Sequence, residues 1–183
     1  MPRSDGSAIL GLTAAAFGLV VLASHPVFAE GGGGGGTDVV ECRKGLVYDK
    51  EKKKCVPAQS GVTPDAVLTE YAYFLAKAGK PEEALSLLDM VQDQQTSMAL
   101  NYRGYATRLT GKVDEGIVYY KQALAIDPGN VLVREYLGEA YVSKGKIAMA
   151  RAQLRKIEEL CGNTTCEQCA DLAEEIEKAE TKG

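Results

Sequence analysis

Apolar residues recur at helical spacing through residues 97–130, in two stretches that are joined at Gly111. The second stretch ends at Pro128, because proline cannot continue a helix and the following Gly129 and Asn130 suit a turn. The pattern therefore predicts two helices joined by a short turn, which together make a unit of 34 residues.

The same unit occurs before and after this one. A glycine opens the turn at spacings of 32 and 34 residues, and a small residue follows five positions later in each copy. The glycines are Gly79, Gly111 and Gly145, and the small residues are Ala84, Gly116 and Ala150. Because one helix pair cannot bury its apolar face alone, neighbouring pairs stack and share a core. The repetition predicts a helical domain over residues 64–164, with repeats at 65–96, 97–130 and 131–164.

Residues 165–183 predict one further helix and a short tail. Its apolar side chains are spaced for one helical face, with charged residues between them: Cys169, Leu172, Ala173 and Ile176. This is the pattern of a helix that covers the last repeat of an array. Two alternative capping boxes could begin it, Thr165 with Gln168 or Thr164 with Glu167.

The repeats resemble the tetratricopeptide repeat family, most specifically in the stretch GKVDEGIVYYKQALAIDPGN at residues 111–130. The resemblance covers residues 65–164 and implies an all-α fold, an α-solenoid of three helix pairs followed by the C-terminal cap helix. Two positions depart from the family pattern. Arg103 stands where leucine is usual, and Gly162 replaces the closing proline of the third repeat.

In this family the first helix of each pair lines a concave groove that binds a protein or peptide ligand. We expect the contacts here to come from Tyr73, Lys77, Asn101, Tyr105, Arg108, Glu135 and Glu139. Tyrosine and arginine are common binding anchors. The lysine, asparagine and arginine set with which chaperone-binding members clamp a terminal carboxylate is missing. Three other tyrosines are expected to pack between helices: Tyr102, Tyr136 and Tyr141.

Residues 1–29 are typical of a secretory signal peptide. The apolar run from Ala8 to Ala23 has 16 residues, which is short for a membrane span of about 20. Val27 and Ala29 then offer small residues at a cleavage site. We expect cleavage after Ala29, only transient contact with the membrane, and a periplasmic protein. An uncleaved signal anchor is the alternative.

Cleavage would remove His25, the only histidine of the chain. The remaining protein would lack the commonest group for acid–base catalysis and for metal binding, so we expect no enzyme, cofactor or metal site. The formal net charge of −4 also indicates no nucleic-acid partner.

Residues 30–63 combine a flexible linker with a small separate unit. Residues 31–36 are six glycines, and the stretch CRKGLVYDKEKKKC at 42–55 predicts a hairpin that a Cys42–Cys55 disulfide would staple. The hairpin stretch also resembles one half of a chitin-binding cysteine module. A structural spacer and a glycan-binding element are therefore both open.

Three interpretations compete for Cys161, Cys166 and Cys169. A Cys161–Cys166 disulfide would close the loop before the cap helix and leave Cys169 free, which the similar ends of small exported tetratricopeptide proteins of Gram-negative bacteria support. Cys166 and Cys169 also form a CxxC at a helix start, where the helix dipole lowers a thiol pKa and favours redox chemistry. Three thiolates could bind zinc, but the sequence offers no fourth ligand.

Together these patterns favour a non-catalytic protein-interaction module, a scaffold or assembly factor in the periplasm or cell envelope. Two alternatives remain. One is an envelope glycan-binding protein that acts through the 42–55 hairpin, and the other is a thiol–disulfide redox protein that acts through Cys166 and Cys169.

Overall fold

The computed structural model describes residues 40–181. The predicted signal peptide, its cleavage site and the glycine linker lie outside these residues. No helix among residues 40–181 is long and apolar enough to cross a bilayer.

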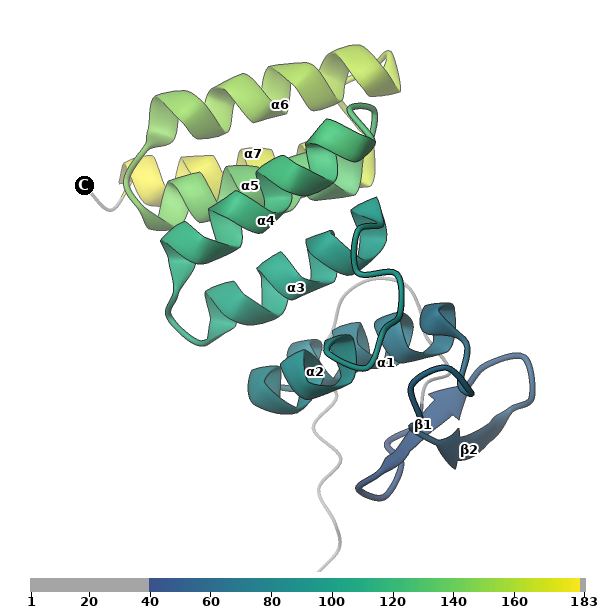
Figure 1. Ribbon diagram of the computed structural model, residues 1–183. Coiled ribbons are helices and arrows are strands. Elements are labelled where there is room, and N and C mark those ends of the chain that lie inside the picture. Colours follow the sequence, from purple (N-terminus) through teal and green to yellow (C-terminus); the bar gives the residue numbers. More distant parts are fainter. Residues whose placement is uncertain (1–39, 182–183) are drawn as a thin grey trace, which may run out of the picture. The chain divides into compact units, whose positions relative to one another are not determined.

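A two-stranded hairpin and seven helices make up the described part of the chain (Figure 1). The strands are β1 (Leu46–Asp49) and β2 (Lys54–Pro57), and the helices are α1 (Asp65–Lys77), α2 (Pro81–Leu88), α3 (Ser97–Leu109), α4 (Val113–Ile126), α5 (Val131–Ser143), α6 (Ile147–Cys161) and α7 (Glu167–Thr181).

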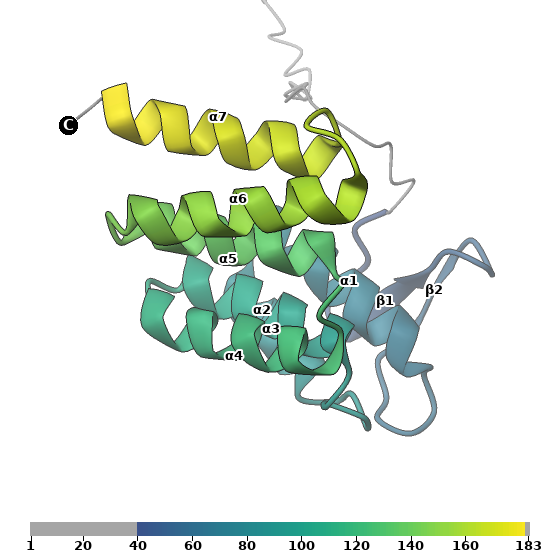
Figure 2. The same cartoon turned by 90° about the horizontal axis from the view of Figure 1, so that it is seen from above.

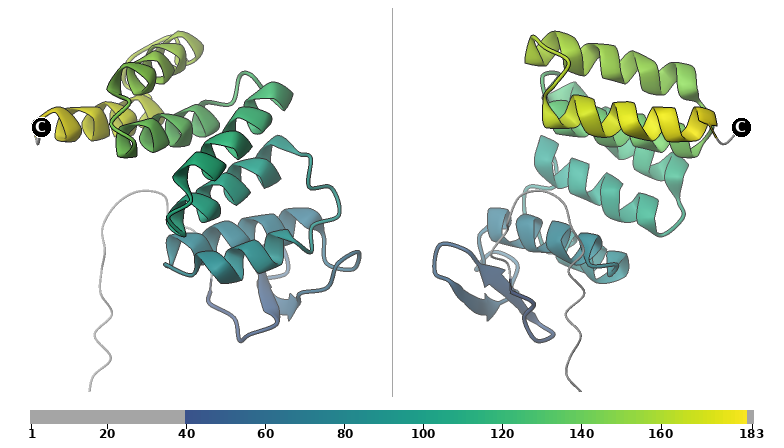
Figure 3. Two further views of the ribbon diagram at one scale, coloured as in Figure 1. Left: turned by 60° about the vertical axis from the view of Figure 1, so that its left-hand side comes forward. Right: turned by 180° about the vertical axis from the view of Figure 1, so that it is seen from behind.

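The helices form three consecutive pairs, α1 with α2, α3 with α4 and α5 with α6. Each pair packs on the next, through α2 and α3 and then through α4 and α5, and α7 packs against both α5 and α6 (Figures 1 and 3). The predicted all-α fold of three helix pairs and a cap helix is confirmed.

The turn of every pair contains a glycine in the left-handed region. Gly79, Gly111 and Gly145 have φ angles of +76°, +87° and +67°. Side chains with a Cβ rarely adopt these angles, whereas glycine adopts them readily. This explains why glycine recurs at this place in each repeat.

The second pair is packed backbone to backbone. A Cβ added at Gly116 would lie 2.9 Å from the carbonyl oxygen of Gly104, and one added at Gly104 would lie 2.9 Å from Cε1 of Tyr120. Real Cβ atoms do not approach other atoms so closely. The two glycines therefore set the distance between α3 and α4, and the ring of Tyr120 fills the space beside them with no exposed surface.

The hairpin is stapled by the predicted Cys42–Cys55 disulfide, whose Cα atoms lie 5.9 Å apart. The expectation of a separate unit is wrong, because β1 packs against α1. Val47 is completely buried in the same core as Leu68, and the backbone N–H of Cys42 donates to the hydroxyl of Tyr71 at 2.6 Å. Within residues 40–181 no repeat precedes α1 to cover its apolar face, and the hairpin takes that place.

Helix α7 covers the other end of the array (Figure 2). Leu172 is fully buried and lies over Gly138 of α5, where an added Cβ would meet Cδ2 of Leu172 at 2.5 Å. Neither predicted capping box forms. The backbone N–H and hydroxyl of Thr165 instead donate to Oδ1 of Asn163, at 2.9 and 3.1 Å, so this side chain shapes the loop before α7.

Candidate functional site

A cluster of tyrosines links the first helices of the three pairs. We call Tyr73 of α1, Tyr102 and Tyr105 of α3, and Tyr136 of α5 the tyrosine cluster. The rings of Tyr73 and Tyr102 stack with centroids 4.4 Å apart, and those of Tyr105 and Tyr136 lie at 4.9 Å. Tyr102 and Tyr136 are buried, whereas Tyr73 and Tyr105 are half-buried. Tyr73 and Tyr105 thus keep part of their surface exposed beside two buried rings.

One cation lies over each of the two half-buried rings. The guanidinium of Arg108 is 5.5 Å from the ring centroid of Tyr105, and the ammonium of Lys77 is 5.9 Å from that of Tyr73. Arg108 also donates to the carboxylate of Glu139 at 2.6 Å, which joins α3 to α5. Since this pair is already formed, Arg108 is held in place beside Tyr105 and is not a free anion site.

Asn101 does not lie on the surface, which corrects its prediction as an exposed contact. The residue has no exposed area, and neither Oδ1 nor Nδ2 of its amide has a hydrogen-bond partner among the described residues. Leaving such groups unpaired costs about 1–3 kcal/mol each. Unpaired buried polar groups of this kind are rare in native proteins.

Glu135 is likewise not an exposed contact, since only 5% of its surface is accessible. It corresponds in the third repeat to Asn101 in the second, and α7 packs against the helix that carries it. Burial, which has the largest effect, and the negative charges of Glu139, Asp171 and Glu167 together raise the pKa of its carboxyl to about 8, while the positive charge of Lys77 opposes this shift. The sequence could not reveal this burial, because it depends on how α7 docks.

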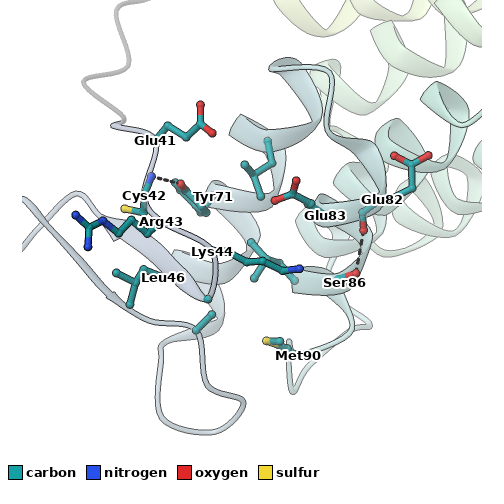
Figure 4. Close-up of a pocket in the computed structure, with 14 residues that line it drawn as sticks. Glu41, Cys42, Arg43, Lys44, Leu46, Tyr71, Glu82, Glu83, Ser86 and Met90 are labelled. Carbon is teal, nitrogen blue, oxygen red and sulfur yellow. Dashed lines mark hydrogen bonds between the residues drawn. The ribbon is translucent and has the colours of Figure 1, made fainter.

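A hollow lies between the hairpin, α1 and α2 and has a volume of about 360 Å³ (Figure 4). Its floor is largely apolar, with Leu46, Tyr71, Leu75, Leu87 and Met90 among its lining residues. Its rim carries both signs of charge, Arg43 and Lys44 from the hairpin side and Glu82 and Glu83 from α2. This mixed rim does not single out one class of ligand.

The three C-terminal cysteines lie together, with their sulfur atoms within 4.8 Å of one another. A disulfide joins Cys161 to Cys166, and the buried thiol of Cys169 lies 2.6 Å from Sγ of Cys166. Burial raises the pKa of this thiol, which opposes the thiolate form that redox and metal chemistry require. With two sulfurs in the disulfide, only one thiol of the cluster is left as a ligand.

Comparison with known proteins supports the repeats. Residues 109–160 match the family model described as tetratricopeptide repeat. A comparison with curated protein sequences finds no match.

Several solved structures have a similar fold. The type III secretion chaperone SycD of Yersinia enterocolitica, in complex with a peptide of the translocator YopD, is 21% identical and aligns over 67% of this chain and 98% of its own, with a TM-score of 0.55. The second tetratricopeptide domain of human RPAP3, in complex with the HSP70 peptide SGPTIEEVD, is 19% identical over 62% and 92%, with a TM-score of 0.51. MamA AMB-1 is 28% identical over 64% and 63%, with a TM-score of 0.51. The helical part of this chain therefore has the fold of tetratricopeptide repeat proteins, and residues 109–160 match the model of that family.

Proposed function

We propose that this protein is an exported, non-catalytic interaction module that binds an extended segment of a partner protein. The binding surface is the first-helix face, which we define as the exposed side of α1, α3 and α5 around the tyrosine cluster. The observation that carries the proposal is the pair of half-buried rings, Tyr73 and Tyr105, which come from successive repeats and meet edge to face.

The rings supply the affinity in this proposal. Tyrosine offers a large contact area with few rotatable bonds and is enriched among the residues that dominate binding energies. Tyr73 and Tyr105 come from successive repeats and meet edge to face, with centroids 5.6 Å apart. An apolar side chain of a bound segment can pack on both at once.

Asn101 lies on α3 with no exposed area, so its amide is not part of the binding surface. The fold itself gives a reason for a peptide ligand. The peptides named in the structures of SycD and human RPAP3 add support from relatives of the same fold.

Export rests on the sequence of residues 1–29, and the absence of histidine after position 25 supports a non-catalytic role. Protein isolated from the native host should begin at Glu30 and be found in the periplasmic fraction. N-terminal sequencing tests this directly, and an intact Met1 in that material would contradict export with cleavage.

Site-specific photo-crosslinking in the native cell tests the binding surface. A photoreactive residue is placed at Met98 or Leu109 of the first helix α3, or at Val118 of α4 or Met149 of α6 as controls. All four residues are 41–52% exposed, so the four positions should crosslink to a similar extent with molecules that they meet by chance. Crosslinks to a partner from the α3 positions alone support the proposal. Crosslinks only from Val118 or Met149, or from none of the four, would overturn it.

A further inference from the structure

The loop between α6 and α7 brings three sulfur atoms together. Cys161 is the last residue of α6, Cys166 directly precedes α7, and Cys169 lies in the first turn of α7. Their Sγ atoms all lie within 4.8 Å of one another. Sγ of Cys166 is bonded to that of Cys161 and lies 2.6 Å from that of Cys169. A change of partner at Cys166 therefore requires only a small movement of side chains.

Hydrogen bonds of Asn163 hold this loop independently of the disulfide. The side-chain amide of Asn163 donates to the backbone carbonyl of Cys161 at 3.0 Å, and its side-chain oxygen accepts from the backbone N–H of Thr165 at 2.9 Å. Neither hydrogen bond involves a sulfur atom, so both can persist when the disulfide changes its partner. The three cysteines should then stay close to one another.

The three cysteines differ in their access to solvent. Cys161 and Cys166 are half-buried, whereas Cys169 is 1% exposed. Cys169 is also the cysteine that carries the free thiol. The thiol of this cluster is thus placed on the residue that a reagent in solution does not reach, while the more accessible Cys161 is held in a disulfide.

We propose that Cys161 is a site of mixed-disulfide formation with small external disulfides, and that Cys169 makes it available by displacing it from Cys166. In the first step the thiolate of Cys169 attacks Sγ of Cys166, and the Cys161–Cys166 bond breaks. Cys161 leaves as a thiolate and takes up the proton that Cys169 released. One disulfide and one thiol are present before and after this step, so it needs neither an oxidant nor a reductant.

The second step uses the external disulfide. The thiolate of Cys161 attacks one of its two sulfur atoms and forms a mixed disulfide, while the other half leaves and takes up the proton to become a free thiol. The net reaction converts one protein thiol and one external disulfide into one mixed disulfide and one small thiol. The buried thiol of Cys169 is thereby exchanged for an adduct on an accessible residue.

Two features keep the first step slow. Burial and the negative charge of Glu158 raise the pKa of the Cys169 thiol, so the attacking thiolate is rare. Cys161 ends α6, and the dipole of a helix disfavours a negative charge at its C-terminal end, so the leaving thiolate is a poor one. The Cys161–Cys166 bond is therefore the form to be isolated, and the migrated bond should accumulate only when an external disulfide captures Cys161.

Oxidised glutathione is the probe, and the position of its adduct is the measurement. The folded wild type is incubated with this reagent, quenched in acid and digested with pepsin, so that no exchange occurs during mapping. Mass spectrometry without reduction should find glutathione on Cys161, together with a Cys166–Cys169 disulfide. Protein unfolded in urea shows that the reagent is active, because unfolding exposes the thiol of Cys169.

Cys169→Ala is the matched control, since it keeps the Cys161–Cys166 disulfide and lacks the attacking thiol. The adduct on Cys161 should be lost completely in this variant. A second variant, Cys161→Ala, leaves Cys166 and Cys169 as the two cysteines of the cluster. These should form a disulfide in the folded variant, which circular dichroism and peptide mapping check together.

Four results would overturn this inference. An adduct on Cys161 in the Cys169→Ala variant would mean that the reagent opens the disulfide without help from Cys169. An adduct on Cys169 of the folded wild type, with Cys161–Cys166 intact, would mean that local opening exposes the buried thiol. The other two are a folded wild type that gains no adduct and a folded Cys161→Ala variant that keeps two free thiols.

Discussion

The hydroxyl oxygens of Tyr73 and Tyr136 lie 2.7 Å apart, although their helices belong to the first and third repeats. Helix α3 lies between α1 and α5 in the stack, so this hydrogen bond spans a whole repeat. In a linear array most contacts join nearest neighbours only. The Tyr73–Tyr136 pair therefore couples the two outer repeats directly.

Removing this hydrogen bond should lower the free energy of unfolding by a small but measurable amount. Tyr73→Phe, Tyr136→Phe and the double variant form a thermodynamic cycle, and we expect a coupling energy of about 1 kcal/mol, typical of one net hydrogen bond. Urea unfolding measures it. Tyr119→Phe on α4 is the control and should leave the midpoint unchanged. Strictly additive effects of the two substitutions would mean that the hydroxyls do not interact in solution.

Gly116 should tolerate no side chain. Gly116→Ala places a Cβ 2.9 Å from the carbonyl oxygen of Gly104, so we expect a loss of about 1–3 kcal/mol, and Gly116→Leu should unfold the array. Circular dichroism during thermal unfolding measures both. Gly129→Ala is the matched control, since its nearest contact would be an ordinary 3.5 Å. Equal stability of the two alanine variants would contradict the close approach of α3 and α4.

Glu135→Gln should stabilise the protein at alkaline pH. The carboxyl pKa is 4.5 in the unfolded chain and about 8 in the folded protein, so the wild type loses stability as pH rises through this interval. The variant has no such proton to lose. We expect equal stability near pH 4.5 and a gain on the order of 1–2 kcal/mol at pH 8.5, below the full value of the pKa shift because water can reach the site.

Urea unfolding of the wild type and the Glu135→Gln variant at both pH values measures this gain. Glu177→Gln should show no pH-dependent difference from the wild type. A loss of stability in Glu135→Gln at pH 8.5 would mean that the ionised carboxylate has a favourable partner in the folded state.

Peptide mapping without reduction should recover two disulfides, Cys42–Cys55 and Cys161–Cys166. Cys169 should react with an alkylating agent only after unfolding, because it is 1% exposed. Substituting Cys169 with alanine should preserve both bonds. A native Cys166–Cys169 bond would contradict the assignment and would favour thiol–disulfide exchange, for which these two sulfurs lie close enough.

The sequence predicted those parts of the structure whose causes are local. The turns could be predicted because their backbone angles suit glycine, at Gly79, Gly111 and Gly145. The close approach of α3 and α4 could be predicted because Gly116 has no side chain. Each of these effects acts within one repeat, and its recurrence in three repeats makes the sequence pattern easier to recognise.

The parts that the sequence did not predict depend on contacts between distant segments. Asn101 and Glu135 occupy positions that face the ligand in the family pattern, yet both are buried. For Glu135 the difference arises from α7, and for the hairpin it arises from Val47, which enters the core of the first repeat. Periodicity reports which side of a helix a residue is on, but it does not report what covers that side.

Both ends of the helical array are closed by elements that carry a disulfide, the hairpin before α1 and the loop before α7. The end repeats of such an array lack a neighbour on one side and need a polar cover for solubility. Here neither end presents a bare helix pair to a second copy. A reducing environment would therefore loosen the array from its ends inward.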